Sequence, residues 1–328
     1  MPAHTLFSSR RRLAIFAIWS ALFTARLVVA ETPKPTHAFM AFGGETRWID
    51  ASGHSVWHYP AATRDGFVLP DGRLLLALSK SDAHPHGAVI IVRPIAPQAG
   101  RIGGYTFTNE FTWEGTQSEV NTAQLTPEGT IVTTEAGDHP RILELSPSGK
   151  IVLEVPLKCQ TTNHHMESRM TRKLANGNYL VPQLLDKVVR EYAPNGTVVW
   201  EYKTPEEPAE SWPFTAIRLL NGNTLINCTH GNHVIEVDAH GKIVWQLTNG
   251  DLPKPWLKDP CGAQRLPNGN TVITSHHAGP KDVKLTEITR EKKVVWTHKD
   301  ETKPGIHHFQ ILDTVIDGKK TAISDPSK

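Results

Sequence analysis

The chain has 328 residues with 35 basic and 33 acidic side chains, so its formal net charge is +2. These charges are interspersed along the chain, which argues against a nucleic-acid-binding protein because that function needs a clustered basic face. Three cysteines (Cys159, Cys228 and Cys261) are too few for a fold that depends on disulfides, and the sequence leaves open whether any two of them are bonded.

Residues 1–30 have the pattern of a signal peptide. Arginines at positions 10–12 are followed by an apolar run over 13–25, and small residues at 28–30 precede a polar segment. An uncleaved membrane anchor is the alternative, but the run is short for a span and Arg26 interrupts its end. We therefore expect a periplasmic or secreted protein in which residues 31–328 form a single domain without a membrane span.

A repeat with an Asn-Gly or similar turn fills most of this domain. Its turn glycines are Gly72, Gly129, Gly177, Gly222 and Gly269. Each turn suits a tight hairpin, and each unit continues through further β-rich segments to a final strand that usually ends in Val-Trp. Four short strands in 45 to 57 residues are typical of a β-propeller blade. No 3.6-residue apolar period of useful length favours helices between the strands.

The two ends of the domain complete one further blade. Residues 37–59 contain only three strands, and residues 306–312 supply the missing first strand. Joining them closes the ring and leaves no open sheet edge. We therefore predict an all-β, six-bladed β-propeller with one blade closed by N- and C-terminal strands. The repeat tryptophans are expected to pack between blades, and the Asn-Gly pairs to serve as turns only.

Reactive side chains gather just before the first strand of each blade, where a propeller has the mouth of its central channel. Two of these segments contain histidine doublets, and histidine can bind a metal, transfer protons or act as a nucleophile. The alternative is that the doublets only hydrogen-bond water and backbone carbonyls. The candidate catalytic residues are His164, His165, His307, His308 and Arg169. The candidate ligand-binding residues are Asp65, Asn121, Glu167, Trp212 and Cys261.

From their positions, five other histidines are not predicted to take part in the site. His230, His276 and His277 follow the predicted second strands, one layer farther from the axis, and are interpreted as solvated or hydrogen-bonded within the fold. His84 and His86 lie in a loop without metal-ligand spacing. No HExxH or cysteine-pair motif predicts a metal site, so the metal content stays open.

The repeat over 219–226 and 234–245 resembles that of PQQ-like (quinoprotein-type) propellers, and more closely that of the six-bladed bacterial arylsulfotransferases. That resemblance implies an exported enzyme in which one channel histidine passes a sulfuryl group from a phenolic sulfate to another phenol. A histidine from the doublets His164-His165 or His307-His308 would then act as nucleophile or acid/base, and Arg169 or Arg172 would hold the oxygens of that group.

Several features depart from this family. Met166 and Phe309 stand where the family has Asp after the doublet, and the segments with Trp212 and Cys261 supply no histidine. The family's extra N-terminal domain has no counterpart. The cofactor is unknown, and PQQ itself is not expected because the chain is short and has no adjacent cysteine pair.

Two functions of different class follow from these observations. The first is a propeller that binds a small polar ligand or a periplasmic protein partner at its channel without catalysis. The alternative is a His-dependent group-transfer enzyme or lyase that acts at the channel mouth on sulfated or carbohydrate substrates.

Overall fold

The computed structural model describes residues 1, 34–95, 106–303, 305–316 and 318–322. The chain divides into a unit of residues 1–33 and a unit of residues 34–328. Apart from Met1, the predicted signal peptide lies outside the described residues. Within the residues described, no helix is long and apolar enough to cross a membrane.

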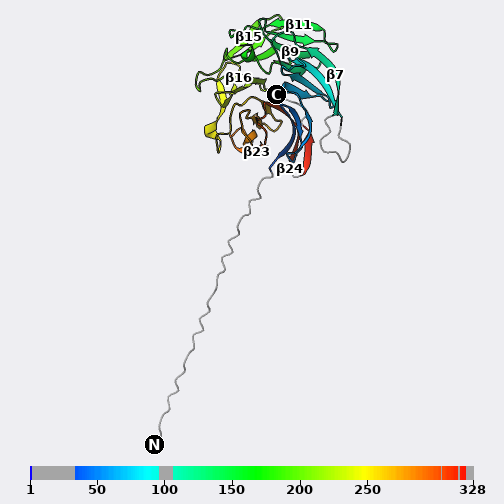
Figure 1. The fold of residues 1–328 in the computed structure, drawn as a ribbon. Helices are drawn as coiled ribbons and strands as arrows, with labels where there is room; N and C mark the ends of the chain where they lie inside the picture. The colour runs from blue at the N-terminus through cyan, green and yellow to red at the C-terminus, as the bar shows by residue number, and fades with distance from the viewer. Residues whose placement is uncertain (2–33, 96–105, 304, 317, 323–328) are drawn as a thin grey trace. The chain divides into compact units, whose positions relative to one another are not determined.

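The second unit is a ring of six small antiparallel sheets, as predicted (Figure 1). One sheet consists of β4 (Thr63–Val68), β5 (Leu74–Leu78), β6 (Ala88–Ile95) and β7 (Thr106–Glu114). The next consists of β8 (Glu119–Leu125), β9 (Ile131–Ala136), β10 (Arg141–Leu145) and β11 (Ile151–Pro156). The third consists of β12 (Arg172–Lys173), β13 (Tyr179–Gln183), β14 (Val188–Tyr192) and β15 (Val198–Lys203).

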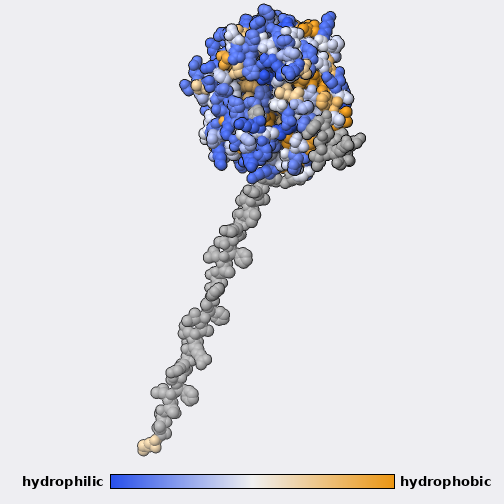
Figure 2. Space-filling view, viewed as in Figure 1, coloured by the Kyte–Doolittle hydropathy of each residue, from blue (hydrophilic) through white to orange (hydrophobic). Residues whose placement is uncertain are grey.

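Two more sheets continue the ring in chain order. One consists of β16 (Pro213–Arg218), β17 (Thr224–Cys228), β18 (His233–Val237) and β19 (Ile243–Thr248). The other consists of β20 (Ala263–Arg265), β21 (Thr271–Thr274), β22 (Val283–Ile288) and β23 (Val294–Lys299). Two short 3-10 helices, η1 (His164–Met166) and η2 (Asn249–Asp251), lie in the connections. The face of this unit turned to the viewer in Figure 2 is mostly hydrophilic, in line with the interspersed charges.

The sixth sheet joins the two ends of the propeller. It contains β1 (Thr36–Phe42), β2 (Thr46–Ile49), β3 (Ser55–Tyr59), β24 (His308–Ile316) and β25 (Lys319–Ala322). β24 pairs with β1, with Phe39 opposite Ile311, so the predicted closure is confirmed. In Figure 1 the red β24 lies beside the blue first strands. β24 runs four residues beyond the predicted end at Leu312, and β25 extends the sheet as an additional fifth strand.

The repeat tryptophans pack between blades, as predicted. The indole Nε1 of Trp200 donates to the carbonyl oxygen of Ala239 at 3.2 Å, and Nε1 of Trp245 donates to that of Arg290 at 2.8 Å. Each acceptor lies in the turn between the third and fourth strands of the next blade. The tryptophan at the end of one blade therefore holds the following one, which explains its recurrence.

The asparagine that follows the Asn-Gly pair in three of the repeats forms a hydrogen bond with a buried glutamate. In the blade of β16–β19, Nδ2 of Asn223 donates to Oε1 of buried Glu236 at 2.7 Å. Oε2 of the same glutamate accepts from Arg265, on the first strand of the next blade, at 2.9 Å. Two other blades repeat this link, as Asn178–Glu191–Arg218 and Asn270–Glu287–His37. The repeat therefore encodes a polar bridge between neighbouring blades.

Replacing Glu236 with Ala should reveal the strength of this bridge. Burial opposes ionisation of Glu236, but hydrogen bonds from Asn223, Arg265 and Arg290 outweigh it and lower its pKa. Removing the carboxylate leaves these donors without their acceptor, so the free energy of unfolding in urea should fall by about 2–4 kcal/mol. The exposed Glu206→Ala change should cost far less, and equal losses in the two variants would contradict the bridge.

Candidate functional site

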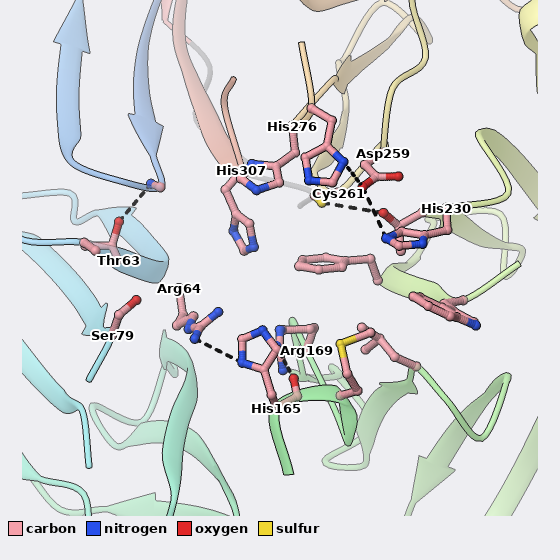
Figure 3. Close-up of a pocket in the computed structure, with 18 of the residues that line it drawn as sticks. Thr63, Arg64, Ser79, His165, Arg169, His230, Asp259, Cys261, His276 and His307 are labelled. Atoms are coloured by element: carbon pink, nitrogen blue, oxygen red, sulfur yellow. Dashed lines mark hydrogen bonds and ion pairs between the residues drawn. The ribbon is translucent and has the colours of Figure 1, made fainter. Parts of the chain in front are cut away.

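A cavity of about 340 Å³ lies where segments entering five of the six blades meet (Figure 3). Its lining residues are Gly43, Gly44, Ala62, Thr63, Arg64, Ser79, His165, Met166, Arg169, Leu184, Trp212, Phe214, Thr229, His230, Asp259, Cys261, His276, His277 and His307. Five histidines and two arginines therefore face one small volume. This is the channel mouth at which the sequence predicted the site.

Arg169 supplies a buried cation to the cavity. Its side chain is 1% exposed, and its guanidinium donates to two backbone carbonyls, those of Ser168 at 2.7 Å and of His165. Its Nε finds no hydrogen-bond partner within the described part of the chain. Burial and the nearby Arg64 lower the pKa of Arg169 to about 9, so it stays charged at neutral pH. A buried guanidinium bonded only to backbone carbonyls is a favourable place for an anion.

Arg64 is the second cation, and a carboxylate from a neighbouring blade partly balances it. Nη2 of Arg64 lies 3.4 Å from Oε2 of Glu119 and 3.3 Å from Nδ1 of His165. Burial opposes ionisation of Glu119, but hydrogen bonding by His165 and the charge of Arg64 lower its pKa to about 2. Oε1 of the ionised Glu119 lies 3.0 Å from Nδ1 of His165, and a tautomer in which Nδ1 donates this bond would leave Nε2 as an acceptor.

His276 and His307 are neutral rings between the charged groups. Their ring centroids are 5.1 Å apart in an edge-to-face arrangement, and His307 also packs edge-on to Phe214 at 4.8 Å. Burial lowers the pKa of His276 to about 4, with a contribution from His277. Burial, His276 and Arg64 hold the pKa of His307 well below its usual range. Nδ1 of each ring is buried and has no hydrogen-bond partner among the described residues.

Asp259 forms the acidic side of the cavity. Its Oδ2 lies 2.5 Å from Nδ1 of His277 and 3.4 Å from Nε2 of His230. The ring of His230 stacks on Trp212 with centroids 4.2 Å apart, which fixes the position of both. The φ of Asp259 is +53°, a left-handed conformation that Asp adopts more readily than most residues. This carboxylate–imidazole pair is an arrangement that can exchange a proton.

Half of the sequence-predicted residues line the cavity. These are His165, His307, Arg169, Trp212 and Cys261. Cys261 is not suited to act as a nucleophile, because burial raises the pKa of its thiol and keeps it protonated. All three cysteines are free, which answers the question of their pairing.

The remaining five predicted residues lie elsewhere. His308 and Asp65 form a buried cluster in which Nη1 of Arg172 donates to Oδ2 of Asp65 at 2.7 Å. Oε2 of Glu167 accepts from the backbone N–H of Gly137 at 3.0 Å, outside the cavity lining. His164 faces Asp138 at 3.4 Å, and Asn121 is fully buried away from the cavity.

Only one histidine of each doublet lines the cavity. In an extended chain this follows because consecutive residues point to opposite sides. His307 faces the cavity at the start of the closing strand, so His308 faces the blade interior. His165 and His164 lie on the 3-10 helix η1, where neighbouring positions also point in different directions. Only one ring of each doublet can therefore reach a common ligand.

His230, His276 and His277 were interpreted too simply from the sequence, since all three line the cavity. They follow second strands β17 and β21, which run antiparallel to the first strands and therefore return to the mouth. Ser79 after β5 reaches the cavity in the same way. If the segments after the second strands had also been considered, the sequence would have predicted these residues. His84 pairs with Glu114 at 3.0 Å on the surface, in line with its predicted solvated position.

Within the residues that the structure describes, no group of three or more His, Cys, Asp or Glu side chains is arranged to hold a metal ion. The cavity instead combines cationic, neutral and acidic groups on different walls. Such a lining suits hydrogen bonding to an organic ligand with an anionic end.

Comparison with known proteins supports the fold. The model of a family described as Mal s 1 allergenic protein-like matches residues 103–251, less than half of the chain. No curated protein matches. A Bacteroides caccae protein of unknown function has a similar structure, with a TM-score of 0.68 and 23% identity over 85% of this chain and 98% of that one.

Two other solved structures share the fold at lower identity. A catalytically inactive virginiamycin B lyase from Staphylococcus aureus with quinupristin has a TM-score of 0.55 and 14% identity, over 89% of this chain and 95% of that one. A putative 6-phosphogluconolactonase from Bacteroides fragilis has a TM-score of 0.52 and 11% identity, over 91% and 98%. These likenesses establish a β-propeller whose relatives in structure have varied functions.

The neutral histidines should make stability depend on pH. The pKa of His276 is about 4 in the folded protein, below the value near 6.5 of an unfolded chain. Below about pH 6.5 the unfolded chain binds a proton first, so the free energy of unfolding falls as the pH falls toward 4. When the pH is lowered from 7 to 5.5, the free energy of unfolding in urea should fall by about 1 kcal/mol less in His276→Gln than in the wild type. His240→Gln, in an exposed turn, should match the wild type, and a His276→Gln profile parallel to wild type would exclude a buried neutral ring.

Proposed function

We propose that the cavity at the channel mouth binds a small organic anion. The observation that carries this proposal is the buried Arg169 guanidinium, which donates hydrogen bonds to the backbone carbonyls of Ser168 and His165. Arg64 adds a second cation whose charge Glu119 balances only in part, because Lys80 also contacts that carboxylate at 3.2 Å. An anion placed between the two guanidiniums would gain charge-assisted hydrogen bonds in a site partly shielded from water.

The other walls favour an anion with an organic body. Phe214 lies under the Arg169 guanidinium, 5.8 Å from its carbon to the ring centroid, and Trp212 forms the adjoining wall. Thr63 and Ser79 contribute hydroxyl groups on the opposite side (Figure 3). A volume of about 340 Å³ suits a small molecule. We place this function in the periplasm or outside the cell, on the basis of the signal-peptide pattern in residues 1–30.

Calorimetric titration with benzoate and with benzamide tests this proposal. The two ligands share size and shape, but only benzoate carries a charge for the guanidiniums. We expect benzoate to bind and benzamide to bind at least about tenfold more weakly. Arg64→Met and Arg169→Met should each weaken benzoate binding by about tenfold or more.

Arg73→Met is the matched control, because Arg73 lies in the β4–β5 turn and pairs with Asp71 at 2.6 Å. Its affinity for benzoate should equal that of the wild type. Equal affinities for benzoate and benzamide in the wild type would rule out an anion site, as would full binding by both cavity variants in a folded state.

A second candidate function, His-dependent group transfer of the arylsulfotransferase type, is favoured by one observation. One ring from each doublet, His165 and His307, lines the same cavity as two arginines. If Nδ1 of His165 donates to Glu119, Nε2 would be the unprotonated nitrogen, as a nucleophile requires. Arg64 and Arg169 would hold the oxygens of the transferred group. The alternative enzyme is a lyase, in which the Asp259–His277 pair would accept a proton from the substrate.

Release of 4-nitrophenolate from 4-nitrophenyl sulfate, with phenol as acceptor, measures this second candidate. If His165 takes the sulfuryl group, His165→Gln should lower turnover by about 100-fold or more. His164→Gln is the matched control, since that side chain faces Asp138 outside the cavity, and it should keep wild-type turnover. A wild-type protein without turnover, or equal losses in the two variants, would reject transfer through His165.

A further inference from the structure

A second cavity of about 370 Å³ shares two lining residues with the mouth cavity. Both cavities are lined by Gly43 and Gly44, which form the turn between β1 and β2. The second cavity extends from this turn over Glu45, Arg47 and the segment around Lys303. The two hollows are therefore neighbours across a boundary made of glycine.

Gly44 adds no side chain to this boundary. It is exposed, and a Cβ built on it would meet no atom within 4 Å. At Gly43 a Cβ would approach the Cβ of His307 to 3.3 Å, so that position has little room for a side chain. The backbone of Gly43 is held in place by hydrogen bonds with Thr63, at 3.1 Å from its N–H and 2.7 Å to its carbonyl oxygen. The space directly beside Gly44 is therefore open.

The second cavity also has cationic and hydroxyl-binding groups. Arg47 is fixed by Asp300 at 2.9 Å and by Glu45 at 3.6 Å, so most of its charge is balanced. Lys303 is exposed at the rim, and Thr302 adds a hydroxyl. This lining suits a polar ligand unit with its own negative charge, which Lys303 would meet.

We propose that the two cavities are successive subsites for a short chain of uronic acids, an inference that rests on the organic-anion function above. A uronic acid has a carboxylate for the guanidiniums, hydroxyl groups for Thr63 and Asp259, and an apolar ring face for Trp212. A second unit across Gly44 would place its carboxylate near Lys303. Two cavities of similar size, each with a cation, match a ligand whose charged unit repeats.

Calorimetric titration of the full protein with D-galacturonate and with trigalacturonate tests this inference. The wild type should bind the trimer at least about tenfold more tightly than the monomer, because only the trimer reaches the second cavity. Gly44→Phe would put a ring on the boundary and should remove most of this advantage. Lys303→Gln should also weaken trimer binding but not monomer binding, without adding bulk.

Gly250→Phe is the matched control. Gly250 is also exposed, its Cβ would meet only Thr248 Oγ1 at 3.5 Å, and it lies in η2 on another blade. That variant should bind both ligands like the wild type. Thermal unfolding of each variant confirms that it is folded.

Each other outcome has a distinct meaning. Equal affinity of the wild type for monomer and trimer, or an unchanged trimer advantage in both Gly44→Phe and Lys303→Gln, would overturn the two-subsite inference. Binding of benzoate but of neither uronide would overturn the uronic-acid class and leave the organic-anion function intact. Binding of none of the three would overturn both.

Discussion

The propeller depends on one buried acceptor that recurs in its third strands. Glu236 is 0% exposed, so its carboxylate must be satisfied by protein groups. It takes one hydrogen bond from its own blade, from Asn223, and two from the next blade, from Arg265 and Arg290. Hydrophobic packing alone would let neighbouring sheets slide, but a directional bridge fixes their relative rotation. That rotation decides which side chains meet at the axis.

Closure of the ring brings the residues of the candidate site together. Because β24 completes the sheet begun by β1, the residue before β24, His307, faces the turn after β1. The same closure places His276 beside His307, although they are far apart in sequence. A polar cavity arises because five of the six blades each contribute two segments to the mouth, one before the first strand and one after the second.

The sequence predicted the fold far better than the site. The Asn-Gly turns and terminal tryptophans are local signals that repeat, so they predict blade count and closure. Half of the predicted site residues line the cavity, since the segments before first strands reach the mouth. Which ring of a doublet faces inward depends on backbone direction at single residues, as His307 and His308 show. The place of His277 depends on its pairing with Asp259 across a loop, which no local pattern reveals.

The charges of the cavity couple its groups to one another. The pKa of His307 is lowered by burial and by the positive charge of Arg64 and Arg169. An anion bound between those guanidiniums would cancel much of their field, and it would make a proton on His307 or His276 less costly. Proton uptake and anion binding must then strengthen each other equally, because coupling free energies are reciprocal. The cavity is therefore cationic on one wall and holds the Asp259–His277 pair on another.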